Sequence, residues 1–112
     1  MLLDYMATYP NARMRYVAGT MQLMVDSDAA YLVLPGAKSC IAGHYMLASH
    51  PNKNNKHLAP HNAPIHVECK TIKNVACSTA EAETAGLFYN GQTASYICSI
   101  LNGMGHLQHP TK

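Results

Sequence analysis

A long helix is predicted to begin in the stretch Ser78-Thr79-Ala80-Glu81-Ala82-Glu83. Ser78 is expected to cap this helix, and the Glu81 side chain is expected to reach back from the third helical position in a capping box. Apolar residues then recur at helical spacing in one stripe: Leu87, Ala94, Ile97 and Leu101. The sequence therefore predicts a helix over about residues 79–101, ended by the glycines that follow.

Four segments ahead of this helix have the pattern of strands: residues 13–17, 21–26, 39–49 and 64–72. Residues 21–26 are mostly apolar in both alternating sets, which is typical of a central strand buried on both faces. In residues 64–72 an apolar set alternates with a polar one, so one face is expected to be buried. Strands followed by a helix that packs on one sheet face make an α+β arrangement.

The segments between these elements are predicted from turn residues and from the lack of periodicity. Leu34-Pro35-Gly36 predicts a turn, and Gly43 marks a bulge or a close approach of two backbones. Residues 1–10 are interpreted as the end of a helix that stops at Pro10. Residues 50–63 are expected to form a loop. His57 and His61 in that loop have the spacing of a metal-binding pair, but a solvated loop is the favoured interpretation.

Charged residues are scarce, at 12% of the 112 residues against roughly 25% in an average soluble domain. The formal net charge of +2 is too small to indicate nucleic acid by itself. No apolar run approaches the roughly 20 residues that span a bilayer, and no basic region precedes an apolar stretch at the N-terminus, as it would in a secretory signal. The cysteines have no C-x-x-C spacing and are interpreted as buried free thiols in a reducing compartment: Cys40, Cys69, Cys77 and Cys98.

Four of the six acids fall in two tripeptides, Asp26-Ser27-Asp28 and Glu81-Ala82-Glu83. Asp28 is explained as a turn residue, and Glu81 by the helix cap. Asp26 closes an apolar strand, and Glu83 lies on the helix face expected to pack on the sheet, where an unpaired carboxylate is costly. Either Asp26 is a strand-end acid and Glu83 is solvated at the core edge, or a hard cation such as Mg²⁺ joins the two.

The order of these motifs resembles the ribonuclease H domain of Ty1/copia-type retrotransposon polyproteins. The similar segments cover nearly the whole chain: Leu2-Leu3-Asp4-Tyr5, Ala7-Thr8-Tyr9-Pro10-Asn11-Ala12, Val25-Asp26-Ser27-Asp28-Ala29, Ile65-His66-Val67-Glu68, Lys70-Thr71-Ile72-Lys73-Asn74-Val75, Ser78-Thr79-Ala80-Glu81-Ala82-Glu83 and Met104-Gly105-His106. The specific part is an acidic tripeptide on a strand, followed by the S-T-x-E-A-E start of a helix.

The resemblance implies an α+β, ribonuclease H-like fold: an antiparallel three-strand start of a mixed sheet, a long helix on one face, and C-terminal elements missing. Residues 1–12 would be the end of a preceding polymerase-connection region, and residues 13–112 a partial ribonuclease H-like domain. Asp26 matches the family's first catalytic, metal-binding Asp, and Glu83 matches its catalytic, metal-binding Glu. The implied chemistry uses two Mg²⁺ or Mn²⁺ ions about 3.5–4 Å apart to hydrolyse the RNA strand of RNA–DNA hybrids.

The resemblance also implies partners. They are an RNA–DNA hybrid and the reverse transcriptase portion of the same polyprotein, with no membrane. Five lysines are candidate phosphate contacts: Lys38, Lys70 and Lys73 first, then Lys53 and Lys56. The expected location is intracellular, either cytoplasmic in a retroelement particle or nuclear. The exposed edge of an incomplete sheet is a route to homo-oligomers.

The chain departs from the family in its acids, because none follows Glu83. The family's third and fourth acidic ligands therefore have no counterpart here. The expected function is that of a metal-dependent endonuclease domain of a retroelement, which by itself holds metal weakly and is inactive or very weakly active. The alternative is a catalytically inactive ribonuclease H-like remnant that acts as a structural or protein-interaction module.

Overall fold

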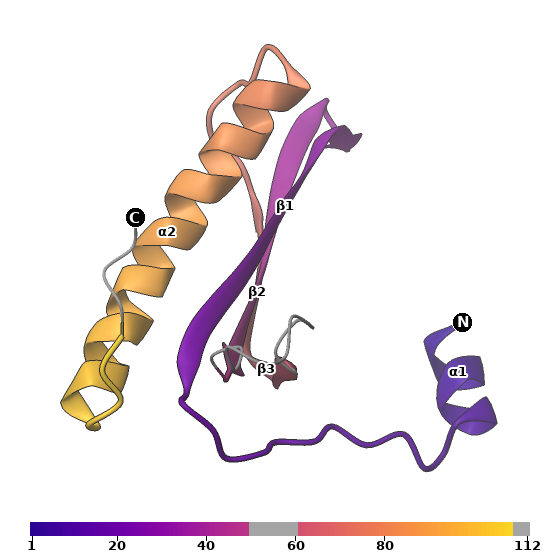
Figure 1. Ribbon diagram of the computed structural model, residues 1–112. Coiled ribbons are helices and arrows are strands. Elements are labelled where there is room, and N and C mark those ends of the chain that lie inside the picture. Colours follow the sequence, from indigo (N-terminus) through magenta and orange to yellow (C-terminus); the bar gives the residue numbers. More distant parts are fainter. Residues whose placement is uncertain (50–60, 109–112) are drawn as a thin grey trace.

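The computed structural model describes residues 1–49 and 61–108. Its elements are α1 (Leu2–Thr8), β1 (Gln22–Leu34), β2 (Lys38–Ala48), β3 (His61–Thr71) and α2 (Thr79–Gly103). The strands form an antiparallel sheet in the order β1-β2-β3. The long helix α2 runs along one face of this sheet over β1 and β2, whereas α1 lies apart at the end of an extended segment (Figure 1). This arrangement confirms the α+β class, the antiparallel strands and the helix on one face.

Strand β1 begins where the sequence predicts but continues to Leu34; among the described strands it lies at an edge of the sheet, and several of its residues are exposed. The prediction of a central strand buried on both faces was therefore wrong. The predicted strand at residues 13–17 is also absent: this segment makes one backbone hydrogen bond to β3, from the N–H of Ala63 to the carbonyl of Arg15 at 3.2 Å, and its next bonds are to a side chain. The amide of Asn62 accepts the N–H of Val17 at 2.8 Å and donates to its carbonyl at 3.0 Å.

A turn at residues 35–37 joins β1 to β2, as the Leu34-Pro35-Gly36 sequence predicts. Gly36 has a φ of 76°, in the left-handed region that glycine adopts without steric cost. Ala37 has a φ of 53° in the same region, where its Cβ costs about 1 kcal/mol. The turn brings the two long strands into an antiparallel pair.

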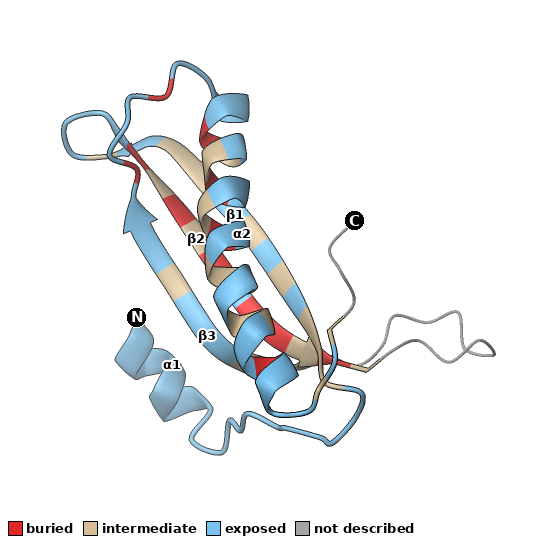
Figure 2. Cartoon of the chain, turned by 90° about the vertical axis from the view of Figure 1, so that its left-hand side faces the viewer, coloured by how far each residue is buried: buried red, intermediate tan, exposed pale blue. Residues whose placement is uncertain are grey.

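Strand β2 lies at the centre of the sheet and holds most of the buried residues beneath α2 (Figure 2). Tyr45 is its one fully buried large side chain among the described residues. The apolar core lies nearer the start of α2 and consists of Ile41, Ile72, Ala76 and Ala82, with Ala29, Tyr31, Ala85 and Tyr89 packed against it. Four of these eight residues are alanines, and their small side chains let helix and sheet approach closely.

Strand β3 turns its polar set, not its apolar set, toward the α2 side of the sheet. Tyr45 lies opposite His66, and Gly43 lies opposite Glu68, so both polar residues share the face of the buried tyrosine. Ile65 and Val67 lie on the other face and are 43% and 56% exposed. The prediction that the apolar set is buried was wrong. Helix α2 covers the opposite face of the sheet, on which Glu68 accepts a hydrogen bond from Thr93 of the helix.

Helix α2 starts at the predicted residue and ends at Gly103, and its packed face is rotated from the predicted stripe only near its start, since Leu101 is buried as predicted and Ala94 and Ile97 are half-buried. Its buried residues are Ala82, Gly86, Asn90 and Leu101. A Cβ on Gly86 would lie 3.3 Å from Ile41 Cγ2 and 3.4 Å from Ser27 Oγ, so the glycine lets the helix approach the sheet closely. Leu87 is 65% exposed, and the prediction that it packs on the sheet was wrong.

The remaining predictions concern cysteines, the N-terminal helix and the loop. All four cysteines are free as predicted, but Cys69 and Cys77 are exposed and the others are half-buried, so the predicted burial was wrong. The predicted helix near the N-terminus is confirmed as α1. The predicted loop, with His57, lies mostly outside the described residues. Within the described part of the chain, neither helix combines the length and apolarity needed to cross a membrane.

Candidate functional site

Asp26 lies in the middle of β1, opposite His44 of β2. Its neighbour Ser27 faces α2, because the Nδ2 of Asn90 donates to Ser27 Oγ at 2.7 Å. Successive side chains of a strand point to opposite faces. Asp26 and Asp28 therefore project together from the face that α2 leaves uncovered, and both are exposed.

Asp28 is a mid-strand residue rather than the turn acid that the sequence suggested, because β1 continues for six residues beyond it. Its Oδ1 accepts the N–H of Ala29 at 2.9 Å. This bond occupies one of the backbone donors of the strand. Its role is therefore local and structural, although the prediction of a turn was wrong.

Glu83 lies in the first turns of α2 and is half-buried. Its neighbour Ala82 is fully buried against the core. Glu83 itself is at the border of the packed face, one helical turn before the exposed Leu87. It makes no hydrogen bond or ion pair with any residue that the structure describes, which fits a partly solvated carboxylate at the core edge.

Asp26 and Glu83 do not share a site in this arrangement. Glu83 belongs to the helix that covers one face of the sheet, whereas the Asp26 side chain leaves the other face. Residues 1–49 and 61–108 contain no group of three or more His, Cys, Asp or Glu side chains that could hold a metal ion. Carboxylates are the donors that Mg²⁺ prefers, but one ion can join these two only if both lie on the same side of β1. The Mg²⁺ or Mn²⁺ site stays a prediction.

Ser78 and Glu81 cap α2 as predicted, with one difference. Ser78 Oγ accepts the N–H of Glu81 at 3.2 Å. The Glu81 carboxylate accepts the N–H of Cys77, one residue ahead of the expected donor. Both residues satisfy backbone donors at the helix start, which is a structural role.

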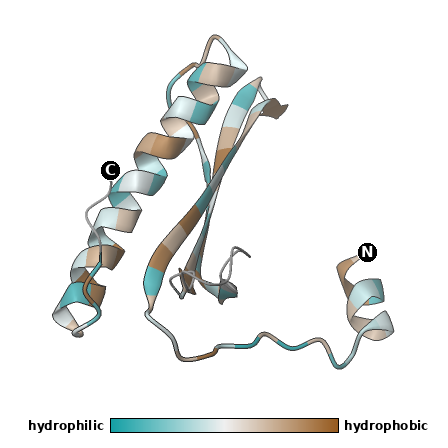
Figure 3. Cartoon of the chain, in the orientation of Figure 1, coloured by the Kyte–Doolittle hydropathy of each residue, from teal (hydrophilic) through white to brown (hydrophobic). Residues whose placement is uncertain are grey.

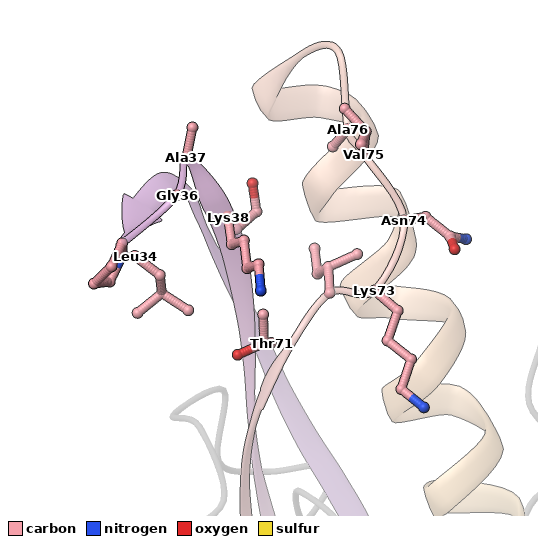
Figure 4. A pocket seen from close by; sticks show the side chains of 12 residues that line it. Leu34, Gly36, Ala37, Lys38, Thr71, Lys73, Asn74, Val75 and Ala76 are labelled. Carbon is pink, nitrogen blue, oxygen red and sulfur yellow. The ribbon is translucent and has the colours of Figure 1, made fainter.

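Lys38 and Lys73 line the same hollow at one end of the sheet (Figure 4). The hollow has a volume of about 660 Å³ and lies between the β1–β2 turn and the segment that leads from β3 to α2. Thr71 and Asn74 also line it. Two of the predicted phosphate contacts are therefore brought together from residues 35 positions apart.

The other predicted phosphate contacts are placed differently. The Lys70 ammonium group forms an ion pair with the Glu68 carboxylate, and this bond holds the pKa of Lys70 above its usual value. Its charge is therefore already neutralised within the protein. Lys53 and Lys56 lie outside the described residues.

A buried polar network, which the sequence analysis did not identify, joins the middle of α2 to the sheet. Tyr45 is 0% exposed and donates its hydroxyl proton to Asn90 Oδ1 at 3.0 Å. Asn90 is 2% exposed, and its Nδ2 donates to Ser27 Oγ and to the carbonyl of Ala42 at 2.9 Å. A Cβ on Gly43 would lie 2.5 Å from Asn90 Oδ1. A side-chain amide, and not a second backbone as the sequence suggested, thus approaches Gly43 closely, and the glycine provides room for it.

Glu68 extends the network to β3. Its Oε2 accepts the hydroxyl proton of Thr93 at 3.1 Å and lies 3.4 Å from the Tyr45 hydroxyl oxygen, whose proton goes to Asn90, and its Oε1 pairs with Lys70. The hydrogen bond from Lys70 is the main reason that the pKa of Glu68 lies below its usual 4.5; Thr93 lowers it further, against the effect of burial. Burial raises the pKa of Tyr45 above 10.0. The network therefore holds a charged carboxylate beside a neutral phenol.

The network gives only a weak signal in the sequence. Asn90 and Tyr45 are 45 residues apart, and Asn90 and Ser27 are 63 residues apart. The one local indication is on α2, where the polar Asn90 lies one helical turn after Gly86 on the packed face. A polar side chain at that position needs partners across the interface.

Comparison with models of known families, with curated proteins and with solved structures finds no match for this chain.

Proposed function

We propose that this chain is a ribonuclease H-like module of a retroelement polyprotein that supports its neighbours structurally and does not cut nucleic acid by itself. The resemblance of its motifs supports the family. The α+β order supports it too, because the acidic tripeptide lies on the first strand and the capped helix packs on the sheet. The proposal that the chain does not cut nucleic acid rests on the position of Asp26, which lies on the face of β1 away from α2, the helix that holds Glu83.

Two-metal hydrolysis needs carboxylates that converge on both ions, so that one ion activates water and the other holds the leaving oxygen. An exposed Asp26 and a Glu83 on the helix side of the sheet do not converge. The chain has no acid after Glu83 to supply further ligands. We therefore expect weak metal binding and no hydrolysis by the 112-residue chain.

The exposed helix α1 supports a structural role. Leu2, Leu3 and Met6 are 72%, 78% and 58% exposed, and α1 has no buried residue. A short apolar helix of this kind gains stability by packing on a neighbouring surface. The reverse transcriptase portion of the same polyprotein is the neighbour that the resemblance predicts.

A cleavage assay with an end-labelled RNA–DNA hybrid in Mg²⁺ and in Mn²⁺ tests the proposal. We expect no cleavage above the protein-free reaction, and the same result for Asp26→Asn and Glu83→Gln. Hydrolysis of the RNA strand by the wild-type chain, lost in both variants, would overturn the non-catalytic assignment and show an active nuclease. Calorimetric titration with Mn²⁺ gives an independent readout of whether both carboxylates bind one ion.

A second, narrower function is favoured by the hollow with two lysines: contact with the phosphates of an RNA–DNA hybrid. Lys38→Gln with Lys73→Gln should weaken hybrid binding and lower the salt dependence by about one unit of slope for each lysine. Arg13→Gln with Arg15→Gln removes the same charge from the exposed segment before β1 and is the matched control. Equal losses in both double variants would mean that the chain attracts nucleic acid through its charge alone.

A further inference from the structure

The outer edge of β3 has two halves, and the first half is already occupied by the chain itself. The N–H of Ala63 donates to the carbonyl of Arg15 at 3.2 Å, and the side-chain amide of Asn62 bonds to the N–H and the carbonyl of Val17. The register with β2 also shifts next to Ile65. An irregular register and occupied backbone groups protect an edge strand from pairing with another chain. The first half of the edge is therefore closed.

The second half of this edge is regular. The N–H of Ile72 donates to the carbonyl of Ser39 at 2.8 Å, and the register with β2 is unbroken over residues 66–71. Since inward and outward backbone groups alternate along an antiparallel strand, every second residue here turns its N–H and C=O away from β2. These residues are Val67, Cys69 and Thr71. No strand that the structure describes pairs with them.

This edge lies on the far side of the sheet from the residues that follow α2. After the helix the chain returns to β1, the opposite edge, where the Gln108 side chain accepts the N–H of Leu23 at 2.8 Å. Helix α2 leaves β3 to one side of it (Figure 2), and the two are joined by the hydrogen bond from Thr93 to Glu68. A strand can therefore approach residues 67–71 without displacing α2.

The charges beside this edge are of both signs. Glu68 and Lys70 lie on the α2 side of the sheet, on either side of Cys69, and form an ion pair. The edge of β1 is different, because its N-terminal half is largely hydrophobic (Figure 3) and it carries Asp26 and Asp28 without any basic residue. An acid and a base two residues apart make the edge of β3 complementary to itself, since a two-fold axis between them sets each acid opposite the other base.

We propose that two copies of this chain pair in antiparallel fashion along β3, about a two-fold axis at Cys69. The outward groups of Cys69 bond to those of Cys69 in the second copy, and the outward groups of Val67 bond to those of Thr71. Each Glu68 carboxylate then lies opposite the Lys70 ammonium group of the other copy. The two sheets become one continuous sheet with both α2 helices on the same face.

The charges also select this register. A shift by two residues in either direction sets Glu68 opposite Glu68 or Lys70 opposite Lys70, and like charges directly opposite each other destabilise a strand pair. The register about Cys69 is the one that gives two attractive pairs. This inference does not rest on the ribonuclease H-like assignment.

Sedimentation velocity over a series of protein concentrations tests the proposal with two charge variants. Lys70→Glu and Glu68→Lys should each weaken dimerisation by about 10- to 100-fold, because two attractive pairs become two repulsive ones. An equimolar mixture of the two variants should dimerise again, since every acid then meets a base in the other chain. Lys38→Glu makes the same change of charge outside β3 and is the matched control, which should keep the dimer.

Cross-linking of the wild-type chain gives a measurement that does not depend on the folding of a charge variant. Cys69 is exposed and would face its counterpart across the axis, so a short bismaleimide should join two chains. Cys69→Ser should abolish this product, whereas Cys77→Ser removes the other exposed cysteine and should leave it. A product lost in Cys77→Ser and kept in Cys69→Ser would overturn the proposed axis.

A proline variant tests the backbone pairing. Cys69→Pro removes the outward N–H at the axis, a change that an edge strand tolerates, and should convert the dimer to a monomer that still unfolds cooperatively. A wild-type chain that stays monomeric at every concentration would overturn the proposal. A dimer that persists in both Lys70→Glu and Cys69→Pro would overturn it as well, because the copies would then meet through another surface.

Discussion

The hydroxyl of Tyr45 donates a hydrogen bond to Oδ1 of Asn90 over 3.0 Å, and both side chains are almost completely inaccessible to solvent. The bond joins the middle of β2 to the middle of α2. Asn90 donates in turn to Ser27 and to the carbonyl of Ala42. Each polar atom of this buried amide has a partner, so removing one partner leaves an unsatisfied group where water does not reach.

Tyr45→Phe should therefore destabilise the protein by about 1–3 kcal/mol, because Asn90 Oδ1 loses its donor while the ring stays packed. The free energy of unfolding from urea titration measures the effect. Tyr96→Phe is the matched control, since Tyr96 is 75% exposed on the same helix, and it should change stability by less than about 0.5 kcal/mol. Equal stabilities of the two variants would show that the buried bond contributes nothing.

Gly43→Ala and Gly91→Ala should change stability in opposite directions. A Cβ at residue 43 would lie 2.5 Å from Asn90 Oδ1, so the amide must move and the variant should lose about 1–3 kcal/mol. A Cβ at residue 91 meets nothing within 4 Å, and alanine in a helix interior is favoured over glycine by about 0.8–1 kcal/mol. Thermal unfolding of both variants provides the comparison, and a stabilised Gly43→Ala would contradict the close approach.

Acid should weaken the fold through Glu68. The pKa of this carboxyl is lowered in the folded state, first by the hydrogen bond from Lys70. A lowered pKa means that the contribution to stability is complete above about pH 4.5 and is lost as the pH falls through the lowered value. Urea titrations across this range should show the loss in the wild type and a smaller one in Glu68→Gln. Lys70→Gln should move the loss to higher pH; an unchanged profile would exclude the ion pair as its cause.

Ser78→Ala should destabilise α2 by about 1 kcal/mol, because the N–H of Glu81 loses the hydroxyl that accepts it. Ser95→Ala, on an exposed position in the interior of the same helix, should be neutral or slightly stabilising, since alanine has the higher helix propensity. Helix content by circular dichroism and the unfolding free energy distinguish the two. A neutral Ser78→Ala would mean that the cap is replaced by water.

The parts of the fold that depend on neighbouring residues were predictable from the sequence. The cap at Ser78 and the turn at Gly36 are set by residues within four positions of each other. The shared face of Asp26 and Asp28 follows in the same way, since the alternation of side chains along a strand is also local.

The orientation of β3 and the rotation of α2 were not predictable in this way. The alternation of apolar and polar residues predicted that Ile65 and Val67 are buried, but it cannot show which face of the sheet the helix covers. The choice depends on Glu68, whose partner Thr93 is 25 residues away. Similarly, Leu87 is the more hydrophobic residue, but Gly86 permits the closer contact with β2. The candidate metal site depends on which face of the sheet α2 covers and on which side of α2 packs there. The sequence could therefore identify Asp26 and Glu83 as candidates, but it could not show whether their carboxylates lie close together.

The hydrogen bond from Thr93 to Glu68 has a mechanical consequence. Helix α2 contacts β1 and β2 extensively, but within the described residues this side-chain bond is its one hydrogen bond to β3. Strand β1 is therefore held by its ladder with β2 and by α2, whereas β3 is held by its ladder with β2 and, at its start, by hydrogen bonds to the extended segment at residues 15–17. Under a pulling force applied across the sheet, β3 would peel away first, and β1, β2 and α2 would remain together as the unit that ruptures last.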